Sequence, residues 1–321
     1  MPIKHRVSVL GLISAGLLAC SACQSTNTVE YLKPLTINIK SEQLLNHFKV
    51  LSSDTFQGRK VSTTGNKKAQ QYLIDQLSTL SVQGFKGQYK HSFHYGSSTY
   101  PKSGNNIIAF IPGSNEANKY IVLTAHFDHL GTKGNRIFNG ADDNASGTSA
   151  LLAMAEQLVN QPLSHHIIVL FTDGEENGLK GSKAFIHDNQ ELLKNIKLNI
   201  NMDMLAGSKR SKNLHFIARG LTKILTDNQL TMFYQNQQTR ELSVVKGFKR
   251  ERHSLNKRTH WLLASDHGSF HQAGIPFIYY GVGTHSNYHS PSDEYLNTNH
   301  QLLTNATNII FQQLLFLDQA I

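Results

Sequence analysis

Short apolar runs that alternate with helix-like segments constrain the fold of this chain most strongly. The runs are rich in β-branched and aromatic residues and lie at 106–111, 120–125, 166–171, 198–204, 214–218 and 276–280. Apolar residues recur at helical spacing from residue 41 and at 66–80, 146–160, 180–187, 221–228 and 302–317. Apolar strands that alternate with helices predict an α/β fold whose mainly parallel sheet carries helices on both faces. Pro112-Gly113 predicts an antiparallel hairpin between the first two strands, so we expect a mixed sheet.

The N-terminus has the layout of an export signal. A positive region at 4–6 precedes an apolar stretch at 7–19, which is too short to be a convincing membrane span. The stretch ends at Cys20 in a pattern that resembles the lipobox of bacterial lipoproteins, whose cysteine is lipidated; cleavage with release is the alternative. We expect a signal peptide at 1–19, a polar tether at 20–40, and a periplasmic protein that touches the membrane only through a lipid on Cys20.

Composition narrows the function classes. The chain of 321 residues is 39% hydrophobic and 17% charged, which fits a folded domain with a sizeable core. The net charge of +9 and a basic run at 246–258 would suit a polyanion. That run has little aromatic interleaving for base stacking, so we expect a solvated loop and no nucleic-acid partner. The whole segment 229–257 is irregular and polar, and we expect loops beside the site there.

Cysteine usage limits the chemistry of any metal site. Cys20 and Cys23 are the only cysteines, and both precede the predicted domain. The domain therefore has no internal disulfide and no thiolate ligand, and a metal site must use His, Asp and Glu.

Residues of these types stand where predicted strands end and where one predicted helix begins. They are His126 and Asp128, Asp142 and Asp143 before the helix at 146–160, Glu175 and Glu176, Asp203, and His289. Each alone has an ordinary explanation, such as a structural histidine, a helix cap or a solvated acidic turn. Because the carboxyl ends of parallel strands share one edge, we expect the set to converge there. Nitrogen and oxygen ligands without sulfur suit zinc in a hydrolytic site, although manganese and cobalt also fit.

The order of these motifs resembles the M28 family of zinc aminopeptidases. The motifs are His126-x-Asp128, the Gly-Ala-Asp-Asp-Asn-x-Ser-Gly of 140–147, Gly174-Glu-Glu176, Asn201-x-Asp203-Met204 and Tyr288-His-Ser-Pro-x-Asp293. The segments 51–59, 265–268 and 273–276 also look like the family's. The resemblance runs from about residue 41 to the C-terminus and implies one catalytic domain over 41–321, with a zinc-exopeptidase fold and peptide substrates.

The resemblance also implies a role for each residue. It makes His126 and Asp203 ligands of one zinc ion and Glu176 and His289 ligands of a second. Asp143 would bridge the two ions, because a shared carboxylate can join metals about 3.5–4 Å apart.

Three further residues receive catalytic roles by the same resemblance. Asp128 would orient His126, and Glu175 would be the general base that takes a proton from the attacking water. Tyr288 matches a tyrosine that some members use to bind the oxyanion, whereas the other tyrosine position of the family holds Leu262.

Several alternatives stay open at this point. The scaffold also carries carboxypeptidases, dipeptidases and glutaminyl cyclases; the cyclases use one zinc, so the pair His126 and Asp128 argues against them. A binding protein that kept the fold without catalysis would have lost ligands or the base, and here all are present. The preferred N-terminal residue and the oligomeric state are not predicted.

Overall fold

A computed structural model of the chain describes residues 1–3, 38–114, 118–237, 241–248, 252–253 and 257–321. Nearly all of the predicted signal peptide and of the tether, with Cys20 and Cys23, lies outside the described residues, as does much of the basic run at 246–258. Residues 34–321 form one unit, which contains every element described below. Among the described helices, none combines the length and apolar character that crossing a bilayer requires.

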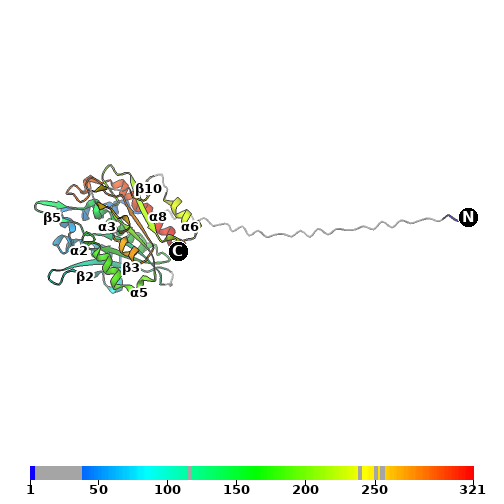
Figure 1. Cartoon of the computed structure of the whole chain (residues 1–321), viewed down its shortest axis with the longest axis horizontal. Coiled ribbons are helices and arrows are strands. Elements are labelled where there is room, and N and C mark those ends of the chain that lie inside the picture. Colours follow the sequence, from blue (N-terminus) through cyan, green and yellow to red (C-terminus); the bar gives the residue numbers. More distant parts are fainter. Residues whose placement is uncertain (4–37, 115–117, 238–240, 249–251, 254–256) are drawn as a thin grey trace. The chain divides into compact units, whose positions relative to one another are not determined.

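The helices cover both faces of one large sheet (Figure 1). They are α1 (Ser41–Leu51), α2 (Thr64–Thr79), α3 (Gly147–Asn160), α4 (Lys180–Asp188), α5 (Gln190–Leu193), α6 (Asp227–Asn236), α7 (His267–Gln272) and α8 (His300–Ala320). The strands of the large sheet are β1 (Gln83–Gly84), β2 (Lys90–Gly96), β3 (Pro101–Ile111), β4 (Tyr120–His126), β7 (His166–Thr172), β8 (Ile196–Met202), β9 (Asn213–Arg219), β10 (Ser243–Lys246) and β13 (Phe277–Gly281). Two small ribbons complete the list, β5 (Gly131–Lys133) with β6 (Arg136–Phe138), and β11 (Arg252–His253) with β12 (Lys257–Arg258).

The sheet is mixed, as the sequence predicts. Its strand order is β1-β3-β7-β4-β8-β13-β9-β10, and β2 pairs with β3. The four central strands β7, β4, β8 and β13 run parallel, whereas β3 is antiparallel to β7 and β9 is antiparallel to β13. The parallel strands therefore bring their carboxyl ends to the same edge.

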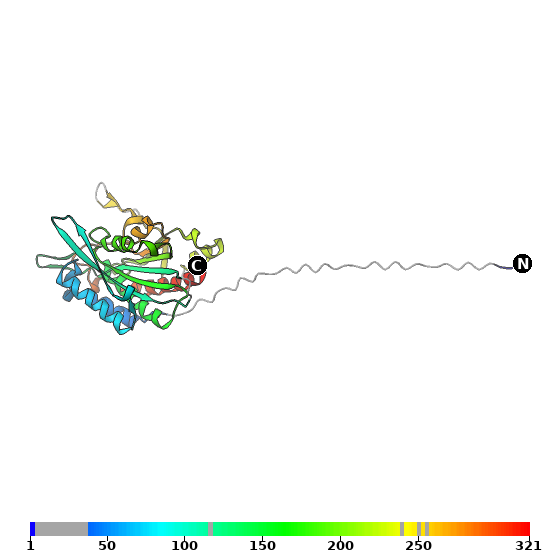
Figure 2. The same cartoon turned by 90° about the horizontal axis from the view of Figure 1, so that it is seen from below.

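Alternation along the strands builds a core on each face. Ile107 faces a cluster that includes residues of α1, α2, α3 and α8, whereas its neighbour Ile108 faces a smaller cluster with Phe185 of α4 and Phe270 of α7. Successive side chains of a strand point to opposite faces, so both faces of a central strand are apolar. The result is a three-layer α/β/α arrangement (Figure 2).

The hairpin expected at Pro112-Gly113 is wrong. Strand β7 lies between β3 and β4, and β3 pairs with β7 instead. The turn packs on the segment that leads into β7. Ser114 N–H donates to Leu163 O at 2.7 Å, and the backbones are so close that a Cβ at Gly113 would lie 2.4 Å from the carbonyl carbon of His165. A local turn signal does not reveal that a strand distant in sequence inserts between its neighbours.

The helix expected at 221–228 and the loops expected at 229–257 also differ. The helix α6 begins only at Asp227, because Thr226 caps it: its Oγ1 accepts from Gln229 N–H at 3.3 Å, and Gln229 Oε1 accepts from Thr226 N–H at 2.9 Å. Residues Leu221–Lys223 form a separate short turn. Within the supposed loop region, β10 extends the sheet as a parallel partner of β9.

Candidate active site

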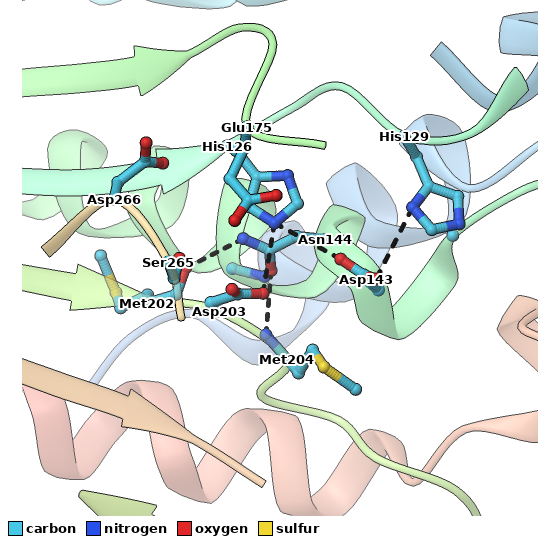
Figure 3. A network of polar contacts seen from close by, with 12 residues as sticks. His126, His129, Asp143, Asn144, Glu175, Met202, Asp203, Met204, Ser265 and Asp266 are labelled. Atoms are coloured by element: carbon cyan, nitrogen blue, oxygen red, sulfur yellow. Dashed lines mark hydrogen bonds and ion pairs between the residues drawn. The ribbon is translucent and has the colours of Figure 1, made fainter. Parts of the chain in front are cut away.

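His126 closes β4 and faces two carboxylates. Its Nε2 lies 3.2 Å from Asp203 Oδ1 and 3.4 Å from Asp143 Oδ1 (Figure 3). Asp203 follows β8, the neighbour of β4, so the parallel pairing of the two strands places these side chains together. His126 and Asp203 are buried, and the three residues form one candidate metal-binding group.

The second oxygen of Asp143 faces another group. Asp143 Oδ2 lies 3.1 Å from His289 Nε2, and His289 Nε2 lies 3.3 Å from Glu176 Oε2. The His289 side chain is 39% exposed whereas that of His126 is 1% exposed, so the site opens to solvent on the His289 side. One carboxylate thus presents an oxygen to each of two neighbouring ligand groups.

The loop before α3 is fixed by Asn144. Its side-chain Oδ1 accepts from Gly147 N–H at 2.9 Å and from Met204 N–H at 3.1 Å, and its Nδ2 donates to Met202 O at 2.9 Å. These bonds join the loop to the end of β8 on both sides of Asp203. The relative positions of Asp143 and Asp203 are therefore set by an amide that hydrogen-bonds through both its oxygen and its nitrogen.

Asp142 is the first member of the aspartate pair, and its side chain accepts backbone hydrogen bonds instead of facing the site. Its Oδ1 accepts from Ala206 and Gly207 N–H, each at 2.7 Å, and its Oδ2 pairs with His285 Nε2 at 2.9 Å. Asp293, the last residue of the C-terminal motif, accepts from the N–H groups of Asp142 and Asp143 at 2.9 and 3.1 Å. The motif thus fixes the backbone that carries the Asp143 carboxylate.

Arg59 explains the resemblance at 51–59. Its guanidinium is completely buried and donates to the carbonyl oxygens of Leu51, Phe127, Asn139 and Gly140 at 2.7–2.9 Å. Burial lowers the pKa of Arg59 to about 10, while nearby carboxylates, Asp293 first, oppose the shift. A buried cation therefore lies behind the acidic site and joins α1 to both site loops.

Asp128 and Glu175 are linked to each other. Asp128 Oδ1 accepts from Glu175 N–H at 3.0 Å and lies 3.8 Å from His126 Nδ1. The closer partner of that imidazole nitrogen is the backbone oxygen of Asp128, at 3.1 Å. The Asp128 residue thus orients His126 through its carbonyl group, and its carboxylate anchors the loop that carries Glu175.

Burial disfavours the anionic form of some of these carboxylates, whereas nearby histidines favour it for others. Burial raises the pKa of Glu175 well above its ordinary value, with Glu176 adding to the shift and His126 opposing it. Burial also raises the pKa of Asp203. For Asp143, burial acts in the same direction, but His129, His126 and His289 hold its pKa well below the ordinary value. Divalent cations would keep every one of these groups ionised, so the donor set fits metal ions.

Two tyrosines lie beside these charges. Tyr288 stacks on His289 with ring centroids 3.8 Å apart, and burial together with Asp143 and Glu176 raises its pKa. Tyr279 of β13 is buried and stacks on His267 at 4.4 Å. Burial, Asp203, Tyr288 and Glu175 raise the pKa of Tyr279 well above its ordinary value, so both phenols stay protonated as hydrogen-bond donors.

The sequence interpretation missed His129 and Tyr279. His129 directly follows the His126-x-Asp128 motif and belongs to a second candidate metal group with Asp143 and Glu176. Its position next to a recognised ligand was the available signal, although a histidine in a strand-end turn is usually structural. Tyr279 lies within a buried apolar strand, so no sequence pattern distinguished it from an ordinary core residue.

Several solved structures share this fold. The B. subtilis zinc aminopeptidase BSAP superimposes with a TM-score of 0.67 at 16% identity, over 86% of this chain and 95% of that one. The LapA aminopeptidase of Legionella pneumophila gives 0.66 at 17% identity, over 88% and 72%. A glutaminyl cyclase of Bacteroides thetaiotaomicron gives 0.65 at 17% identity, over 87% and 98%, so the fold does not separate these activities.

The fold is therefore that of the zinc aminopeptidases. The profile of Peptidase family M28 matches residues 106–314, and the chain belongs to that family. Aminopeptidase YwaD of Bacillus subtilis is 30% identical over 217 residues, which is 65% of this chain and 44% of YwaD. Leucine aminopeptidase 1 of Grosmannia clavigera is 26% identical over 186 residues, 56% of this chain and 44% of that protein. The chain thus spans less than half the length of these relatives.

Proposed function

We propose that this chain is an aminopeptidase that removes N-terminal residues from peptides at a site for two zinc ions. The observation that carries the proposal is the position of Asp143, whose Oδ1 lies 3.4 Å from His126 Nε2 and whose Oδ2 lies 3.1 Å from His289 Nε2. Asp203 completes one ligand group and Glu176 the other. The aminopeptidase relatives support the reaction class.

The chain's own residues divide the work of hydrolysis. Bound zinc ions would polarise the scissile carbonyl and lower the pKa of the attacking water. Glu175 takes a proton from that water and returns it to the leaving amine. Asp128 fixes the Glu175 loop through the N–H bond at 3.0 Å. Tyr288 donates a hydrogen bond to the oxyanion.

Other reactions on this scaffold are less well supported. A glutaminyl cyclase with one zinc ion would not need a carboxylate that faces two ligand groups. A binding protein would not need Glu175 beside the ligands. A carboxypeptidase or dipeptidase would use the same ions, and only the pocket walls would differ.

The N-terminal segment gives the proposed location. The sequence at 4–20 supports export and attachment to a bacterial membrane through a lipid on Cys20. The proposed substrates are peptides.

Two variants of the purified protein test the assignment of ions and base together. Glu175→Gln should keep two equivalents of zinc and lose about 10²–10⁴-fold in turnover, since it removes only the proton transfer. Asp143→Ala should lose zinc from both ligand groups. Near-normal turnover of the first variant would disprove the role of the base, and two retained equivalents in the second would disprove the bridge.

A further inference from the structure

His129 is held in place beside the second ligand group. Its ring is buried, and the loop that leads to Asp143 packs directly on it. A Cβ at Gly140 would lie 2.4 Å from two ring carbons of His129, and Gly140 has a φ of +55°. Only glycine allows this approach, so the loop leaves the imidazole one position.

That position brings one ring nitrogen close to two proposed ligands. His129 Nδ1 lies 2.8 Å from Glu176 Oε1 and 3.7 Å from Asp143 Oδ2. His289 contacts the other oxygen of Glu176, and the two imidazole rings are 5.8 Å apart at an angle of 62°. Glu176 is therefore flanked by a histidine on each side.

His129 Nδ1 and Glu176 Oε1 form a close ion-pair contact of 2.8 Å. Both ring nitrogens of His129 and the Glu176 Oε1 atom are buried and lack a partner in good hydrogen-bond geometry. A buried polar atom left unpaired costs about 1–3 kcal/mol, so a cation bound between His129 Nδ1 and Glu176 Oε1 would stabilise both. The ligand atoms of His129, Asp143 and Glu176 all lie within 4.8 Å of one another, which is the spacing of groups around one ion.

We propose that His129 Nδ1 is a fourth protein ligand of the ion at Asp143, Glu176 and His289. The two ions then differ, because the ion at His126 has three protein ligands. Zinc sites closed by four protein ligands are typical of structural zinc, whereas three ligands leave a position for water or substrate. An ion held by the His126 group would therefore be the one with a position left for water. This inference rests on the proposed two-ion site.

Cobalt substitution of the full-length protein tests the ligand directly. Each imidazole bound to Co²⁺ through one nitrogen leaves an exchangeable N–H proton on the other, whose NMR signal is strongly shifted by the ion. We expect three such signals in the wild type and two in His129→Gln, which fills similar space. We also expect the second equivalent of zinc to bind at least about 10-fold more weakly in this variant.

His165→Gln is the matched control. His165 is also buried and pairs with a carboxylate, Asp318 Oδ1 at 2.9 Å, away from the site, so this variant should keep three signals and both zinc affinities. Two signals in a wild type that binds two ions would overturn the proposal. So would weaker zinc binding in His129→Gln with three signals retained, because His129 would then only orient Glu176. A wild type that binds a single ion would instead contradict the proposed function.

Discussion

Asp143, the proposed bridge between two ions, is held in place by several neighbouring groups. Asp293 accepts its backbone N–H at 3.1 Å, and the Asn144 side chain joins the next residue to the end of β8. Three histidines outweigh burial and hold its pKa well below the ordinary value. The Asp143 carboxylate is therefore positioned by the protein itself.

Two tyrosines, Tyr288 and Tyr279, are candidates for the hydrogen-bond donor to the oxyanion. Tyr288 stacks on a proposed ligand, whereas Tyr279 has the charges of Asp203 and Glu175 nearby. If Tyr288 binds the oxyanion, Tyr288→Phe should lower kcat by about 10²–10³-fold with little change in zinc content. Tyr279→Phe is the matched control and should lose much less. Steady-state kinetics of both variants measure the two losses in kcat. A larger loss in Tyr279→Phe than in Tyr288→Phe would assign the oxyanion donor to Tyr279.

The predicted ligands came from motifs, and the structure brings all of them together. His126, Asp143 and Asp203 lie in one group, and Glu176 and His289 lie beside the other oxygen of Asp143. His129 and Tyr279 escaped because their places beside the site depend on what packs against them. The spacing of residues along the sequence does not show that Gly140 packs against the His129 ring. Nor does it show that Tyr279, a buried strand residue, borders the site.

At the scale of elements, periodicity predicted the central strands and most helices. It failed where a distant segment decides the outcome, as with β7 between β3 and β4. It also failed at α6, where the capping residue Thr226 sets the start of the helix, and at β10, whose only neighbour in the sheet is β9. Apolar patterns reveal that a segment is buried, but pairing partners come from the whole chain.

The long helix α8 is joined to the start of β7 by one carboxylate. Asp318 accepts from Ser164 and His165 N–H, each at 2.8 Å, and pairs with His165 Nδ1. Burial alone would raise the pKa of Asp318, but these bonds lower it. A lowered folded-state pKa stabilises the fold above the unfolded value near 4, and this stabilisation is lost as the pH falls through the folded value.

We therefore expect Asp318→Asn to lower the free energy of unfolding by about 1.5–3 kcal/mol at pH 7, with a smaller difference from wild type below about pH 4. Denaturant unfolding at several pH values measures this. Asp188→Asn is the control, because its pair with His187 is exposed and contributes little. Equal destabilisation at pH 3 and pH 7 would contradict the account of Asp318.

At the scale of the whole molecule, the catalytic unit and the N-terminal segment make separate predictions. Lipidation at Cys20 predicts that the protein partitions into membranes and that Cys20→Ser abolishes this while leaving peptide hydrolysis intact. Fractionation of cells that express each form is the measurement. A wild type found wholly in the soluble fraction would disprove the anchor without affecting the proposed activity.

The central claim is that the chain cleaves from the amino end of peptides. Hydrolysis of one leucine-initiated peptide by the zinc-loaded protein, with its amino terminus free or acetylated, tests this directly. The account predicts release of leucine from the free peptide and no cleavage of the acetylated one. Cleavage of both peptides, or release from the carboxyl end, would contradict the aminopeptidase assignment.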